Sequence, residues 1–211
     1  MRRKELVKLV AGFRRFRQRY YEGENPVFDR LSQGQSPKTL VIACSDSRVD
    51  PAIITDASPG EIFVIRNVAN LVPPFEKNGG FHGVSSAIEF AVVNLKVNNI
   101  IILGHRHCGG IRALMTGLDN PAPSFIQNWM NIAASAKETV MKKYAGSSSE
   151  DLHIHCEHES IRISIRNLKT FPFVERAIKE RGMNIIGAYF DLDEGHLLEM
   201  NEVSGEFTAL I

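Results

Sequence analysis

The chain has 211 residues, 44% of them hydrophobic, and its 25 Lys and Arg against 24 Asp and Glu leave a formal net charge of +1. A near-neutral chain of this size can bury one sizeable core, so we expect a single domain over residues 1–211. The charge balance predicts neither nucleic acid nor an anionic membrane as a partner. No apolar run approaches the roughly 20 residues of a membrane-spanning helix, and the first residues lack an apolar signal core, which predicts a cytoplasmic protein.

The cysteine content argues against a disulfide framework. The chain carries three cysteines, Cys44, Cys108 and Cys156, an odd number that is too small to staple a fold of this length. In a reducing compartment such residues are expected to be buried thiols or metal ligands.

The N-terminal segment predicts an amphipathic helix between Lys4 and Tyr21, because its apolar residues recur at helical spacing. Its other face carries several arginines, which could form an anion-binding patch. The near-neutral net charge favours a solvated face instead. The apolar positions are Leu6, Leu9, Val10, Phe13, Phe16 and Tyr20.

Short apolar runs alternating with helical segments follow in the rest of the chain. Ser86 and Glu89 form a capping-box signature that predicts a helix over 87–96. Buried strands alternating with helices predict an α/β fold, with a central mainly parallel sheet flanked by helices. The predicted strands are 39–43, 61–66, 99–103, 184–191 and 197–200; the other predicted helices begin near residue 110 and cover 124–144, 150–170 and 174–181.

Two of the predicted strands end in residues that suit a metal ion. The first is followed by Cys44 and Asp46, and the third by His105, His107 and Cys108. In open α/β sheets ligands bind at the carboxyl ends of the strands, so neighbouring strands would bring one cysteine to a His/Cys pair. Two thiolates and one imidazole suit zinc, and three protein ligands leave a fourth position open, as in catalytic sites. The spacing alone leaves open which of the two histidines is the ligand.

The two motifs together, ACSDSRVDP (43–51) and GHRHCGGI (104–111), resemble those of the β-class carbonic anhydrases. The likeness extends through GQSPKTLVIACSDSR, PGEIFVIRNVANLVPP, GVSSAIEFAVVNLKV and CEHESIRISIRNLKTFPFV. It implies a zinc lyase that interconverts carbon dioxide and bicarbonate, with one zinc per subunit held by Cys44, His105 and Cys108. His107 then lies outside the ligand set. We expect it to point away and bind a backbone carbonyl rather than to shuttle protons.

The resemblance also implies a catalytic pair beside the zinc. Asp46 would orient the zinc-bound hydroxide, and Arg48 would bind that carboxylate with two parallel hydrogen bonds. A salt bridge without a chemical role is the alternative. Family members that close the site at low pH carry a tryptophan, an arginine and a tyrosine for bicarbonate. This chain has Val41, Arg66 and Phe190 at those places, so we expect an open site.

The substrate pocket is implied by resemblance as well. An apolar wall suits carbon dioxide, while an amide and a backbone N–H suit bicarbonate oxygens. The aromatic positions could equally be core residues, but in this family they come from the partner subunit. A homodimer or a dimer of dimers is therefore implied, with the N-terminal helix packing on the partner. The implied pocket residues are Gln35, Phe63, Val68, Phe90 and Gly109.

A second group of ligand types lies at 153–158, where His153, His155 and His158 surround Cys156. No complementary ligands occur nearby, so we interpret these as adventitious surface histidines, with Cys156 packed inward. Two rival functions remain open for the whole chain. One is hydrolysis of carbonyl sulfide or carbon disulfide on the same scaffold, and the other is a non-catalytic protein in which zinc only stabilises the fold.

Overall fold

The computed structural model describes residues 2–22, 26–77, 80, 82–117 and 125–210. The chain divides into two compact units, Met1–Ser36 and Pro37–Ile211. A single domain over the whole chain stays a prediction. Among the described helices, none has the length and apolar content that crossing a membrane requires.

The first unit contains helices α1 (Arg2–Tyr21) and α2 (Val27–Leu31). The predicted amphipathic helix is confirmed, whereas α2 was not predicted. The ring of Phe28 on α2 stacks on Tyr21 at a centroid distance of 4.6 Å and meets Phe16 edge-on at 5.5 Å. Several apolar side chains of α1 are exposed: Leu6, Val7, Leu9, Val10 and Phe13.

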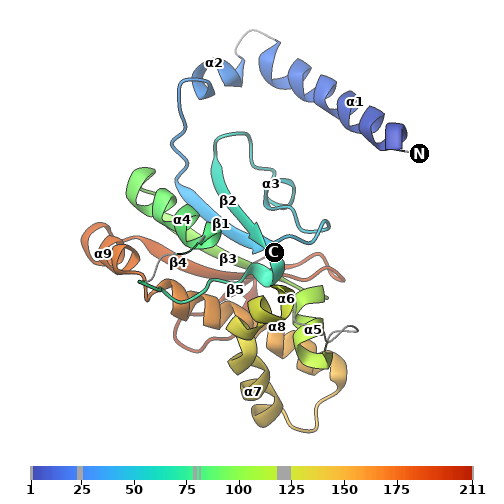
Figure 1. Cartoon of the computed structure of the whole chain (residues 1–211), viewed down its shortest axis with the longest axis vertical. Coiled ribbons are helices and arrows are strands. Elements are labelled where there is room, and N and C mark those ends of the chain that lie inside the picture. The colour runs from blue at the N-terminus through green and yellow to red at the C-terminus, as the bar shows by residue number, and fades with distance from the viewer. Residues whose placement is uncertain (1, 23–25, 78–79, 81, 118–124, 211) are drawn as a thin grey trace. The chain divides into compact units, whose positions relative to one another are not determined.

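A six-stranded sheet forms the centre of the second unit, with strand order β2-β1-β3-β4-β5-β6 (Figure 1). The first four strands of that order pair in parallel and the last two pairings are antiparallel, which confirms the predicted mainly parallel sheet. The strands are β1 (Thr39–Cys44), β2 (Ile62–Asn67), β3 (Asn99–His105), β4 (Asn184–Phe190), β5 (Leu197–Met200) and β6 (Phe207–Ala209). The last strand was not predicted, because three residues are too few to display alternation.

Helices connect and cover these strands. The bounds are α3 (Pro51–Ile54), α4 (Gly83–Glu89), α5 (Gly109–Thr116), α6 (Phe125–Met130), α7 (Ala134–Lys143), α8 (Ser149–Leu168) and α9 (Pro172–Arg181). Single short turns occupy Val68–Asn70 and Asn131–Ala133. The helix predicted over 124–144 is thus broken between α6 and α7, and residue 124 lies outside the described residues.

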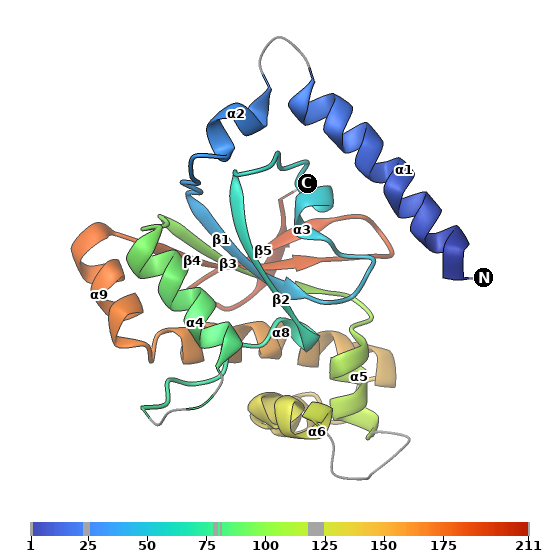
Figure 2. The ribbon, with the colours of Figure 1, turned by 45° about the horizontal axis from the view of Figure 1, so that its top comes forward.

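The larger core lies on one face of the sheet, where α8 runs along the strands (Figure 2). Leu40, Ile42 and Ile102 point into it and are fully buried, because alternate residues of a strand share a face. The opposite face is buried by a smaller cluster that includes Val41 and Ala43. β1 is therefore apolar on both faces, as the sequence predicted.

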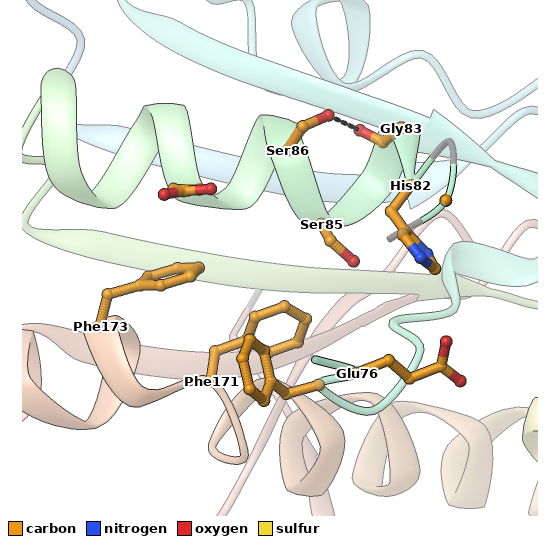
Figure 3. Close-up of a pocket in the computed structure, with 10 residues that line it drawn as sticks. Glu76, His82, Gly83, Ser85, Ser86, Phe171 and Phe173 are labelled. Carbon is orange, nitrogen blue, oxygen red and sulfur yellow. Dashed lines mark hydrogen bonds between the residues drawn. The ribbon is translucent and has the colours of Figure 1, made fainter. Parts of the chain in front are cut away.

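The capping box predicted at Ser86 is wrong. Helix α4 begins three residues earlier, at Gly83, and the Ser86 hydroxyl donates to the Gly83 carbonyl at 3.1 Å (Figure 3). A serine that binds the preceding turn of its own helix cannot cap a helix beginning after it. The helix continues as a π-helical turn over Phe90–Asn94, which ends it two residues before the predicted boundary.

Gly104 lets α8 approach β3 closely. A Cβ atom at this position would lie 2.6 Å from Ile161 Cδ1 and 2.9 Å from Ile161 Cγ1. Both residues belong to elements packed in the larger core, so neither side has space to move. The glycine that precedes His105 thus serves helix packing.

We expect Gly104→Ala to lower the free energy of unfolding by about 1–3 kcal/mol, since it overpacks a filled core. Chemical denaturation measures this change. Adding Ile161→Val should recover part of the loss, because it removes the atom nearest the new methyl group. Gly83→Ala is the control, as a Cβ there meets nothing within 4 Å. A Gly104→Ala variant as stable as that control contradicts the prediction.

Candidate metal centre

Three buried side chains converge at the carboxyl ends of two neighbouring strands. β1 pairs in parallel with β3, with Ala43 opposite Leu103. Cys44 is the last residue of β1, His105 is the last residue of β3, and Cys108 is the residue before α5. The two Sγ atoms lie 4.0 Å apart, and the ligand atoms of the three residues all lie within 4.8 Å of one another. β1 and β3 are neighbours, which is the condition under which the sequence brings one cysteine to the His/Cys pair.

The residues present fit a tetrahedral metal ion. Zn–S bonds of about 2.3 Å place two thiolates about 3.8 Å apart across a tetrahedral edge, close to the observed separation. His105 Nδ1 lies 2.8 Å from the Arg106 carbonyl, so the proton belongs on Nδ1 and the Nε2 lone pair is free. His105 Nε2 is buried without a hydrogen-bond partner among the described residues. Two cysteine sulfurs beside an imidazole nitrogen with a free lone pair form a set of ligands that zinc prefers.

The thiols and the imidazole perturb one another electrostatically. A hydrogen bond from Cys108 lowers the pKa of Cys44, whereas the neighbouring Cys44 sulfur and burial raise the pKa of Cys108. Burial lowers the pKa of His105, but the Cys44 thiolate outweighs it and the pKa is raised. Two buried thiols that cannot both ionise readily on their own are stabilised as thiolates by a divalent cation.

Asp46 and Arg48 form a two-point ion pair at the edge of this group. Arg48 Nε donates to Asp46 Oδ1 at 3.0 Å and Nη2 donates to Oδ2 at 2.7 Å. Hydrogen bonds from Arg48 hold the pKa of Asp46 well below its usual range. The carboxylate is therefore ionised, and its side chain keeps some exposure to solvent.

Arg66 braces the backbone that carries Cys44 and Asp46. Its Nε donates to the Cys44 carbonyl at 3.0 Å and its Nη2 to the Asp46 carbonyl at 2.6 Å, while Nη1 pairs with Asp50 at 2.7 Å. Arg66, Val41 and Phe190 occupy the three positions at which some family members carry their bicarbonate-binding residues. Val41 and Phe190 pack in the smaller core. All three side chains thus serve the local structure.

His107 has a left-handed backbone, with φ of 58°, and its ring is held by a carboxylate. Its Nε2 lies 3.0 Å from both carboxylate oxygens of Asp193, in the turn after β4. The expected backbone carbonyl partner is therefore wrong. The turn between β3 and α5 brings the His107 ring to the turn between β4 and β5. No local sequence pattern indicates this contact.

The implied pocket residues fall into two groups. Val68 packs in the cluster that contains Cys44 and Cys108, and Gly109 is the exposed first residue of α5. Phe63 and Phe90 lie together, with ring centroids 5.9 Å apart, but Phe63 pairs with the fourth residue before Cys44, roughly 13 Å along the strand. These two rings do not join the metal centre of their own chain. Gln35 is exposed in the first unit.

The interpretation of 153–158 as surface histidines is wrong. His158 stacks on Phe207 at 4.0 Å and meets Tyr189 edge-on at 4.4 Å, while His155 stacks on Tyr144 at 3.6 Å. Burial lowers the pKa of His158 to about 3. These histidines pack as aromatic rings, because α8 lies between α7 and the sheet. Cys156 is fully buried, as expected.

Two buried residues beside the centre were not recognised from sequence. The Glu157 carboxylate accepts a hydrogen bond from the Cys108 N–H at 2.8 Å and another from the Tyr189 hydroxyl at 2.6 Å. Both side chains are almost fully buried. The sequence feature that could have revealed Glu157 is an acidic residue on the apolar face of the helix predicted over 150–170.

A separate hollow lies away from this centre. It has a volume of about 610 Å³ and lies between α4 and the start of α9 (Figure 3). Phe171 and Phe173 face the side of α4 that carries Ser85, with His82 and Glu76 at one end. None of the three metal-centre residues lines it.

The fold and the buried Cys-His-Cys group define an α/β protein with three side chains that could hold a metal ion, and comparisons with known proteins narrow the class. The carbonic anhydrase family matches residues 39–197. Beta carbonic anhydrase 3 of Arabidopsis thaliana is 39% identical over 191 residues, which cover 89% of this chain and 74% of that protein. The β-carbonic anhydrase CcaA has a TM-score of 0.89 at 34% identity, over 99% of this chain and 93% of that one. One of two tetrameric β-carbonic anhydrases of Sordaria macrospora has a TM-score of 0.79 at 28% identity, over 98% of both chains.

The chain therefore belongs to the carbonic anhydrase family, and its relatives are of the β class. Members of this class are carbonate dehydratases, which are lyases, and they are zinc enzymes. The resemblance drawn from the two sequence motifs is confirmed.

The buried His158 predicts a pH-dependent stability. Its pKa is about 3 in the fold against an ordinary value of about 6.5. The unfolded chain thus binds more protons between these values, and stability falls as the pH drops below 6.5. From pH 7.5 to 5.5 the wild type should lose about 1 kcal/mol more unfolding free energy than His158→Phe, which keeps the ring stacking.

Chemical denaturation of both proteins at both pH values measures this difference. Taking the difference between variant and wild type cancels the contribution of other titrating groups. His155→Phe is the control, since the burial of that ring is smaller. Equal losses in the wild type and His158→Phe contradict the prediction.

Proposed function

We propose that this chain is a zinc-dependent carbonate dehydratase that interconverts carbon dioxide and bicarbonate. The observation that carries the proposal is the convergence of Cys44, His105 and Cys108 at one edge of the sheet, with an unused imidazole nitrogen. Membership of the carbonic anhydrase family supports the reaction. The cytoplasmic location expected from sequence stays a prediction.

Cys44, His105 and Cys108 would hold one zinc ion per subunit. Three protein ligands leave one position for solvent or substrate, as in catalytic zinc sites. Bound zinc supplies a nucleophile at neutral pH by lowering the pKa of a water molecule towards 7. The protein contributes fixed ligand positions and a largely buried cavity wall.

Asp46 would orient the attacking water. Its carboxylate is ionised and fixed by Arg48 through two hydrogen bonds, so it can accept a hydrogen bond from the attacking water in one defined direction, which leaves an oxygen lone pair facing carbon dioxide. Arg48 also donates to the His107 carbonyl at 3.2 Å, which fixes the guanidinium. This division of roles needs no movement of the pair during attack.

We infer an open site, with Asp46 kept off the metal by Arg48. The ion pair supports this state, since two charged hydrogen bonds would have to break before the carboxylate could turn away. Arg66 is occupied by two backbone carbonyls and Asp50. Val41 and Phe190 present only apolar surface beside it, so bicarbonate finds a poor alternative binding site there.

The substrate pocket would be shared between two subunits. Val68 and the Gly109 N–H come from the subunit that holds the metal, while Phe63, Phe90 and Gln35 would come from its partner. The distance of Phe63 from Cys44 along the sheet supports this division, as does the 44% exposure of Phe90.

We propose a homodimer or a dimer of dimers. Exposed apolar side chains along α1, such as Leu9 and Phe13, would be buried on the partner. The tetrameric assembly of the Sordaria macrospora relatives supports the higher order.

The catalytic role of Asp46 is tested by stopped-flow hydration of carbon dioxide. Asp46→Asn keeps the shape but loses the charge that orients water, so kcat/KM should fall by at least about a hundredfold with zinc content unchanged. Asp56→Asn is the matched control, because Asp56 is exposed and belongs neither to the three candidate ligands nor to the Asp46–Arg48 pair. No turnover by the wild type favours the structural-zinc alternative. Slow hydration with rapid sulfide release from carbonyl sulfide favours the sulfur-substrate alternative.

If each site is shared between two subunits, two variants with different defects should restore activity when they form a mixed dimer. Cys44→Ser lacks a metal ligand but keeps Phe90, whereas Phe90→Ala keeps its metal ligands. A mixed dimer then contains one complete site, so subunit exchange should raise the specific activity above the mean of the two parents. A mixture of Cys44→Ser with Cys108→Ser is the control and should gain nothing. Activity equal to the parental mean would rule out a shared pocket.

A further inference from the structure

One peptide unit at the metal centre is held by charged side chains at both of its polar groups. The His107 carbonyl accepts from Arg48 Nη2 at 3.2 Å, and the Cys108 N–H donates to Glu157 Oε1 at 2.8 Å. Arg48 follows β1, whereas Glu157 lies on α8. Two elements far apart in sequence therefore fix the orientation of the peptide that precedes a candidate metal ligand.

The turn needs such support. His107 has a left-handed backbone, which a residue with a Cβ adopts only when its surroundings enforce it. The turn must also aim the Cys108 sulfur at the point reached by His105 Nε2. Rotation of the peptide between His107 and Cys108 would move that sulfur, so the two hydrogen bonds define its position.

Glu157 is a costly group to bury for packing alone. Its exposed fraction is 3%, and among the described residues no lysine or arginine side chain pairs with it. Its donors are the Cys108 N–H and the Tyr189 hydroxyl. Tyr189 lies in β4 opposite Gly104, so the sheet that carries His105 also fixes the carboxylate.

We propose that Glu157 is a positioning residue for the Cys108 ligand, and that Tyr189 holds its carboxylate in place. The inference rests on the proposed zinc site. A continuous series of hydrogen bonds then runs from Tyr189 through Glu157 and the peptide to Arg48, and from there to Asp46. The Glu157 carboxylate thus fixes the peptide that positions the Cys108 ligand, and the same peptide binds Arg48, which holds Asp46.

The test measures zinc release from purified holoenzyme into excess chromogenic chelator. Glu157→Ala should release zinc at least about tenfold faster than the wild type, since partners that orient metal ligands change affinity by 10–100-fold. Glu157→Gln should stay within about threefold of the wild type, because its amide oxygen accepts the Cys108 N–H and its NH₂ can donate to Tyr189. Tyr189→Phe should be intermediate.

A second readout is the absorption spectrum of the cobalt-substituted protein, which reports ligand geometry. We expect the thiolate and d–d bands to shift in Glu157→Ala and to return in Glu157→Gln. Ser164→Ala is the matched control. Ser164 is a fully buried α8 side chain that binds the Asn70 carbonyl and the Val72 N–H, so its loss weakens the fold without touching the Cys108 peptide.

Release rates and spectra of Glu157→Ala equal to those of the wild type overturn the inference. A Gln variant as fast as the Ala variant also overturns it, since charge rather than hydrogen bonding would then matter. If Glu157→Ala does not fold, Tyr189→Phe decides, because zinc release no faster than in Ser164→Ala overturns the proposal. A wild type that binds no zinc overturns the proposed function together with this inference.

Discussion

The parallel pairing of β1 with β3 is the constraint on which the metal centre depends. It places Cys44 and His105 at the same edge, because Ala43 lies opposite Leu103. A shift of one residue would turn alternate side chains to the other face. Apolar residues on both faces of β1 fix the register, since such a shift would exchange the contents of the larger and the smaller core.

Pairing alone does not complete the site, because two turns must adopt left-handed backbone conformations beside it. Ala69 has φ of 63° and His107 has φ of 58°. The first turn is closed by Asn67, whose side chain accepts from the Leu71 N–H at 2.8 Å and donates to the Leu71 carbonyl at 2.9 Å. The second is bound by charged side chains at the following peptide. Because these hydrogen bonds hold the two strained backbone conformations in place, the strain fixes the geometry of the site rather than weakening it.

The parts of the fold predicted correctly are those encoded by local apolar patterns. Buried strands such as β1 and β3 follow from continuous aliphatic runs, and residues at their carboxyl ends follow from sheet topology. The start of α4 was predicted wrongly because Ser86 can bind either its own preceding turn or a following N–H. The partner of His107 and the role of Glu157 depend on contacts between β3, β4 and α8. Such contacts join residues 32 or more positions apart, and no local pattern encodes them.

Buried histidines show why ligand-rich sequence alone is a poor guide to metal sites. The Nε2 atoms of His105 and His158 are both buried without hydrogen-bond partners among the described residues. Aromatic rings surround His158, so burial keeps it neutral, and it belongs to no group of three potential ligands in the described part of the chain. His105 faces two thiols from separate chain segments. An unused imidazole nitrogen therefore indicates a metal site only where independent elements bring further ligands to the same point. The short motif at the end of β3 meets that condition. The segment 153–158 on α8 contains more histidines but does not meet it.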